Sequence, residues 1–191
     1  MTKGHSGENK ANVMISEELA AIVSICAGNN MVRKYIGTQF YFFKDRGYVT
    51  INSINKDIFE KPSINSNNLT LISLIENRLN NLEDEKKRNK IKISLRWYYM
   101  ALNENGRDAF LKYWISVETI GKESFKKNTN ITSEINEKFS DIYNMDKNDA
   151  AEYFEIGKLL RLRTDIVHDG EFIHVDSNLC SYIECVYKDL L

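Results

Sequence analysis

The sequence predicts an all-α protein, a bundle of four to five core helices with a small β-hairpin insertion near residues 38–53. One observation is the scarcity of turn residues, because 191 residues include a single proline and nine glycines. A β-sandwich or barrel needs many more tight turns. The other is that apolar residues recur three and four positions apart from about residue 68 nearly to the end. Both favour helices over strands.

The first third of the chain has a different character. Residues 1–14 are polar, and we expect them to be disordered. Ser16 is a suitable N-cap for a first helix that Gly28 would end. Aromatic and β-branched runs at 40–43 and 48–51 then flank a turn containing glycine, which predicts the hairpin. We expect residues 15–62 to form a helix-and-hairpin extension packed on the bundle.

The remaining residues, 63–191, are predicted to form the helical domain. Its helices are expected to be joined by short connections, so that sequence neighbours pack antiparallel. After helices covering roughly residues 69–101, the later ones are expected at Arg107–Glu123, at Ile135–Tyr143, as one long helix from Ala150 to His168, and at Ser177–Leu190.

Composition excludes several classes of protein. A net charge of −1 gives no global attraction to nucleic acid, so any RNA contact needs a local site. No apolar run approaches the 18 or so residues of a membrane span, and the polar N-terminus has no signal-peptide core. Three cysteines form no disulfide framework, which suits a cytoplasmic protein. Phosphate-binding loops and nucleophile-elbow motifs are absent from the sequence.

A charged residue interrupts one apolar stripe. Arg163 lies among residues that should face the core, namely Ile156, Leu159, Leu160, Ile166 and Val167. A buried guanidinium is costly unless it is paired. Glu118 is the only charge on the corresponding seam of helix 107–123. We therefore predict that Glu118 and Arg163 meet across two packed helices.

His168 ends the same predicted helix. By helical phase its face also carries Arg161, Thr164 and Asp165. Imidazole can take up and release a proton near neutral pH, and guanidinium binds phosphate through two parallel hydrogen bonds. Together these groups suffice for metal-free RNA cleavage, in which the ribose 2′-OH attacks the adjacent phosphodiester. Phase favours Arg161 as the neighbour of His168, so which arginine contacts phosphate is open at this point.

The segment Leu-Leu-Arg-Leu-Arg-Thr-Asp-Ile-Val-His-Asp-Gly, residues 159–170, resembles the signature helix of the HEPN superfamily, an Arg followed after four to six residues by His. Residues 108–120 resemble the Phe-Leu…Glu helix of the Apea-like branch. The resemblance covers roughly residues 68–190. It implies a HEPN-like bundle that forms a homodimer, with two Arg–His pairs converging on one cleft. The catalytic residues would be Arg163 and His168, supported by Glu118, Arg161, Thr164 and Asp165.

The activity that this resemblance implies is that of an endoribonuclease without metal or other cofactor, from a toxin–antitoxin or antiviral defence system. Its partners would be RNA, a second copy of the chain, and a cognate antitoxin or a defence-complex protein. Active members usually carry Asn, Asp or His after the arginine, whereas this chain has Thr164. The alternative is a non-catalytic HEPN module that binds RNA or a nucleotide, or that dimerises within a larger complex.

Other interpretations of the same residues are simpler. A histidine at a helix C-terminus also stabilises the helix dipole. The spacing of His168, His174, Cys180 and Cys185 along the chain matches none of the usual spacings of zinc ligands. The basic run at 86–92 is more typical of a solvated helix face than of an RNA-binding surface.

Overall fold

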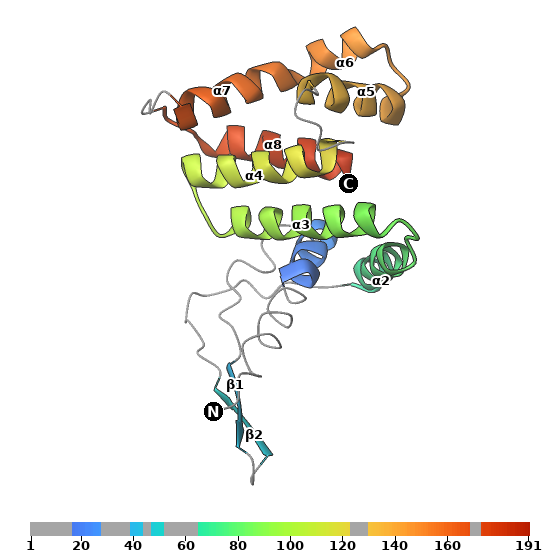
Figure 1. Cartoon of the computed structure of the whole chain (residues 1–191), viewed down its shortest axis with the longest axis vertical. Coiled ribbons are helices and arrows are strands. Elements are labelled where there is room, and N and C mark those ends of the chain that lie inside the picture. The colour runs from blue at the N-terminus through green and yellow to red at the C-terminus, as the bar shows by residue number, and fades with distance from the viewer. Residues whose placement is uncertain (1–16, 28–38, 44–46, 52–64, 123–129, 169–172) are drawn as a thin grey trace. The chain divides into compact units, whose positions relative to one another are not determined.

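The computed structural model describes residues 17–27, 39–43, 47–51, 65–122, 130–168 and 173–191, the two strands without their side chains. The described residues are predominantly helical (Figure 1), which agrees with the predicted all-α class. The stretch expected to be disordered, 1–14, lies outside them. Of the described helices, none combines the length and apolar character that crossing a bilayer requires.

The chain divides into two compact units, Met1–Ile75 and Glu76–Leu191. In the first, residues 17–27 form a helix, and strands β1 (Gln39–Phe43) and β2 (Gly47–Ile51) pair antiparallel, with Tyr41 opposite Val49. The predicted packing of residues 15–62 on the helical domain stays a prediction.

Helix α2 (Ser66–Asn80) crosses the division between the units. Its first turn is closed by a reciprocal pair of side-chain bonds, in which the backbone N–H of Asn65 donates to Asn68 and that of Asn68 donates to Asn65. Each amide thereby satisfies a donor that a helix start leaves unpaired. The Asn68 side chain also donates to the Cys26 carbonyl at 2.8 Å, which joins α2 to helix 17–27 within the first unit.

The second unit contains the longest helices. Helix α3 (Glu85–Leu102) begins at Asp84, whose carboxylate accepts from two backbone N–H groups of the first turn. Helix α4 (Gly106–Gly121) follows after a tight connection in which Gly106 has a φ of +56°. The last helix, α8 (Ser177–Leu190), packs against α4.

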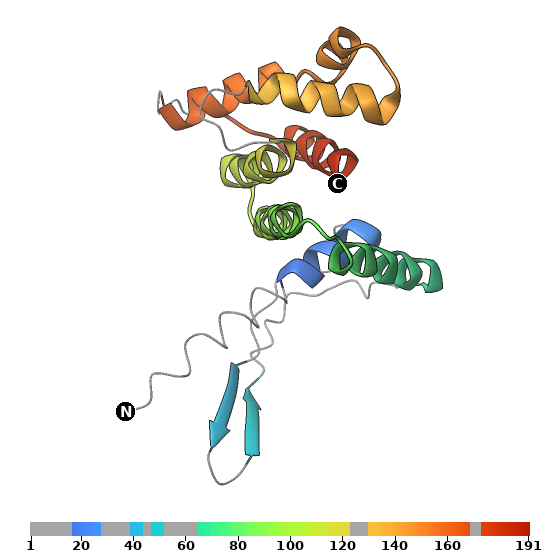
Figure 2. The ribbon, with the colours of Figure 1, turned by 45° about the vertical axis from the view of Figure 1, so that its right-hand side comes forward.

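Helices α3, α4 and α8 bury the main core of this unit, and Figures 1 and 2 show them stacked together. The rings of Tyr98 from α3 and Tyr187 from α8 stack with centroids 4.9 Å apart. Burial of such large aromatic side chains supplies much of the hydrophobic stabilisation of a domain. The largest fully buried side chains include Trp114, Tyr98, Tyr187, Phe110, Leu95, Ile183 and Val117.

A second group of helices lies on the other side of the core: α5 (Ile131–Tyr143) and α7 (Ile156–His168) pack on α4, and α6 (Lys147–Phe154) packs on α5. Gly121 allows α5 its close approach to α4, because a Cβ at that position would lie 2.5 Å from Cγ1 of Ile135. Phe139 and Phe154 stack with centroids 3.8 Å apart and hold α6 against α5.

The single long helix predicted from Ala150 to His168 is wrong. The chain breaks at Glu155, which adopts the left-handed conformation with φ 48° and separates α6 from α7. The hydroxyl of Tyr182, on α8, donates to the carbonyl of Phe154 at 2.7 Å. A carbonyl that loses its partner in the helix is thereby satisfied from a distant element.

Candidate functional site

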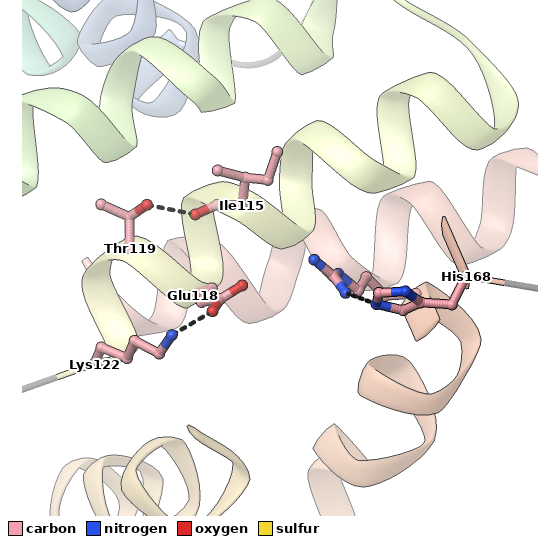
Figure 3. A network of polar contacts seen from close by, with 6 residues as sticks. Ile115, Glu118, Thr119, Lys122 and His168 are labelled. Atoms are coloured by element: carbon pink, nitrogen blue, oxygen red, sulfur yellow. Dashed lines mark hydrogen bonds and ion pairs between the residues drawn. The ribbon is translucent and has the colours of Figure 1, made fainter. Parts of the chain in front are cut away.

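Arg163 and His168 come together near the end of α7. Nη1 of Arg163 lies 3.3 Å from Nε2 of His168, the contact drawn at His168 in Figure 3. His168 is exposed and Arg163 is half-buried. Because a guanidinium can only donate, Nε2 must accept, so this contact belongs to the neutral imidazole that carries its proton on Nδ1.

The arginine that contacts His168 is not the one that helical phase favours. Arg161 is exposed and makes no hydrogen bond or ion pair to any described residue. Seven residues return a helix to the same face, but they separate Arg161 and His168 by about 10 Å along the axis. Five residues give about 7.5 Å, which the long side chain of Arg163 covers. Reach, rather than phase, therefore selects Arg163.

Glu118 does not pair with Arg163, so this prediction is wrong. Its carboxylate instead binds the ammonium of Lys122 at 2.5 Å, one turn along α4 (Figure 3). The Glu118 side chain is 30% exposed and that of Lys122 is 29% exposed. A lysine four residues after a glutamate is an ordinary helical ion pair.

The reason for this difference lies in the burial of α7. Its first half is packed in the core, with Ile156 0% and Leu159 4% exposed. Its second half is not, because Val167 is 47% exposed and Ile166 is half-buried. Arg163 thus keeps contact with water and does not need a buried carboxylate to compensate its charge.

The other predicted supporting residues have modest roles in this structure. The Thr164 hydroxyl donates back to the carbonyl of Leu160 at 2.9 Å, which occupies it within its own helix. Asp165 is half-buried and makes no hydrogen bond or ion pair within the described part of the chain. Of the six predicted site residues, the structure therefore brings only Arg163 and His168 into contact.

Sequence reasoning overlooked a buried charge elsewhere in the second unit. Glu184 of α8 is 6% exposed, accepts from the Tyr98 hydroxyl at 2.9 Å and binds the Lys188 ammonium at 2.7 Å. Burial, and after it the charge of Glu184, raises the pKa of Tyr98. The clue in the sequence was the position of Glu184 between the apolar residues Ile183 and Tyr187, with Lys188 one turn further on. This cluster joins α3 to α8, with the Glu184 carboxylate buried and the Lys188 side chain 30% exposed.

No group of three or more histidine, cysteine or acidic side chains suitable for a metal ion occurs in the described residues. The three cysteines are free, and burial raises the pKa of the Cys180 thiol. His174 is exposed.

We compared the chain with models of known protein families, with curated proteins and with solved structures, and none of them matches. The function must therefore be argued from the site itself.

Proposed function

We propose that the chain is a metal-independent endoribonuclease of the HEPN type, with Arg163 and His168 as its catalytic residues. The observation that carries the proposal is the 3.3 Å contact between the guanidinium of Arg163 and the exposed imidazole of His168. A neutral imidazole can take the proton of a ribose 2′-OH, and the guanidinium can bind the phosphate that this oxygen attacks.

The charge balance around Arg163 supports this role. Within the described residues, its only hydrogen-bond contact is with His168, and the nearest predicted counter-ion, Glu118, is bound to Lys122. An arginine with no carboxylate partner keeps most of its five N–H donors for an anion. When phosphate takes the guanidinium, Nε2 of His168 loses its donor, and its lone pair becomes available to the 2′-OH.

A single imidazole moves one proton at a time, whereas cleavage needs a base for the 2′-OH and an acid for the leaving oxygen. We therefore propose that two chains place their Arg–His pairs in one composite cleft of a homodimer. The exposed Val167 and the half-buried Ile166 beside the pair offer apolar surface for such a contact. The proposed setting is a cytoplasmic toxin–antitoxin or antiviral defence system, with a cognate antitoxin or defence-complex protein as a further partner.

The test is cleavage of RNA by the purified full chain in the presence of EDTA. We expect products ending in a 2′,3′-cyclic phosphate, and a loss of rate of at least about a hundredfold in both His168→Ala and Arg163→Ala. His174→Ala and Arg78→Ala are matched controls, since each removes an exposed side chain of the same type. Equal rates for wild type and His168→Ala would refute the assignment, and activity that EDTA abolishes would refute the metal-free mechanism.

The composite cleft is tested separately by sedimentation of the same preparation. We expect a dimer at the concentrations at which RNA is cleaved. A monomer that cleaves at the full rate would contradict the shared cleft without contradicting the roles of Arg163 and His168.

The alternative of a non-catalytic module is favoured by one observation. Thr164 stands where active members of the HEPN superfamily usually carry Asn, Asp or His, and its hydroxyl is bound to its own helix. In that case the chain binds RNA without cleaving it, and Arg163→Ala weakens this binding.

A further inference from the structure

A group of exposed tyrosines lies at the end of the second unit opposite His168. Tyr153 of α6 is 74% exposed, Tyr143 of α5 45%, and Tyr182 of α8 37%. Single exposed aromatic side chains are common, but several that lie next to one another indicate a binding surface. We call these three residues the tyrosine patch.

The three side chains gather around one buried ring. The centroid of the Phe154 ring lies 5.3 Å from that of Tyr143 and 5.0 Å from that of Tyr153. The backbone carbonyl of Phe154 accepts a hydrogen bond from the Tyr182 hydroxyl. Phe154 itself is stacked on Phe139 in the core. The patch is therefore built around a buried residue by side chains from three helices.

The surroundings of the tyrosine patch are acidic. Residues 141–155 carry five carboxylates and one lysine, a net charge of −4. That lysine, Lys147, is bound to Glu137 at 3.2 Å, and one of the five carboxylates, Glu155, is bound to Lys158, which leaves four without a lysine partner in this segment. A hydrogen bond to the Asp189 carboxylate raises the pKa of Tyr143, which places a further negative charge at the edge of the patch.

The tyrosine patch and the Arg–His pair are separate surfaces. Helix α7 starts beside α6 and runs away from it in both views (Figures 1 and 2), and its 13 residues span about 20 Å before the end at His168. The patch is therefore not an extension of the RNA site, and its negative charge opposes binding of phosphate.

Exposed tyrosine faces ringed by carboxylates match one kind of ligand. Guanidinium groups stack on aromatic faces and pair with carboxylates at the same time. We infer that the tyrosine patch is a docking surface for an arginine-rich segment of a partner protein. The carboxylates of residues 141–155 attract the segment, and Tyr153, the most exposed of the three rings, stacks on it. This inference does not depend on the proposed ribonuclease activity.

The experiment measures binding of fluorescein-labelled nona-arginine to the full chain by fluorescence anisotropy. Tyr153→Ser removes the most exposed ring, and Glu152→Gln with Glu155→Gln removes one charge of α6 and the charge of the residue that follows it. We expect each change to raise the Kd at least about fivefold. The control is Glu83→Gln with Glu85→Gln, which removes the same number of exposed carboxylates before and at the start of α3 and should change the Kd less than twofold.

Three outcomes would overturn the inference. An equal loss in the control would mean that the peptide senses net charge alone. Preferential binding of labelled oligouridine, lost in Tyr153→Ser, would mean that the rings stack on bases. A dimer of the free protein that Tyr153→Ser converts to a monomer would mean that the patch is covered by a second copy of the chain.

Discussion

Replacement of Gly121 by alanine tests the close packing of α4 on α5. The new Cβ would lie 2.5 Å from Cγ1 and 3.0 Å from Cδ1 of Ile135. Ile135 is fully buried, so no free space lies beside its side chain. Either the two helices must separate or the side chain must adopt an unfavourable rotamer. Overpacking of this kind costs about 1–3 kcal/mol.

An opposing effect must be subtracted from this cost. Alanine is favoured over glycine in a helix interior by roughly 1 kcal/mol, and by less at Gly121 because it is the last residue of α4. The net expectation is a loss of about 1–2 kcal/mol in the free energy of unfolding. Gly157→Ala is the matched control. Its Cβ would meet only Cγ2 of Thr132, at an ordinary 3.9 Å, so the free energy of unfolding of that variant should rise by roughly a few tenths of a kcal/mol.

Urea unfolding followed by tryptophan fluorescence is the appropriate assay, because both tryptophans, Trp97 and Trp114, belong to the second unit. Ile135→Ala removes both clashing atoms at its own cost of about 2–5 kcal/mol. In a double-mutant cycle, that cost should be at least about 1 kcal/mol smaller when residue 121 is alanine. A Gly121→Ala protein as stable as wild type, or one whose cost adds to that of Ile135→Ala, would refute the packing argument.

Three further changes test local features of the second unit by the same unfolding assay. Glu155→Gly should stabilise it by up to about 1 kcal/mol, because glycine adopts the left-handed conformation without strain; a destabilised variant would contradict the break between α6 and α7. Asp84→Ala should cost about 1 kcal/mol by removing the N-cap of α3, whereas the neighbouring Glu83→Ala should cost little. Tyr98→Phe should cost about 1–3 kcal/mol, since Glu184 loses a buried donor; an unchanged stability would show that Tyr113 and Lys188 satisfy the carboxylate without it.

The sequence allowed prediction of those features that depend on local periodicity. The helical class follows from apolar spacing, and α8 begins and ends where that spacing places it. The break at Glu155 could not be predicted, because neither proline nor glycine occupies the break position and the freed carbonyl is satisfied by Tyr182, 28 residues away along the chain. A partner at that distance leaves no trace in the local pattern.

The candidate site, too, was predicted only where its contacts are local in the sequence. Arg163 and His168 are five residues apart on one helix, and the motif resemblance placed the arginine at position 163, whereas helical phase alone favoured Arg161. The partner of Glu118 required a choice between Lys122 on its own helix and Arg163 on another, and the sequence does not show how deeply the end of α7 is buried. The nearer pair stays partly hydrated and needs less desolvation than a pair in the core, and it is the one that forms.

This difference bears directly on function. If Glu118 neutralised Arg163, the arginine would be a structural element whose donors are already occupied, and phosphate would have to compete with a carboxylate. In the observed arrangement, Lys122 takes the carboxylate, and within the described part of the chain the guanidinium makes one long contact, with the imidazole of His168. That contact is weak because the donor–acceptor distance is 3.3 Å and the pair is exposed to water, so an incoming phosphate loses little by breaking it. The absence of the predicted ion pair therefore favours an anion-binding role for Arg163 over a purely structural one.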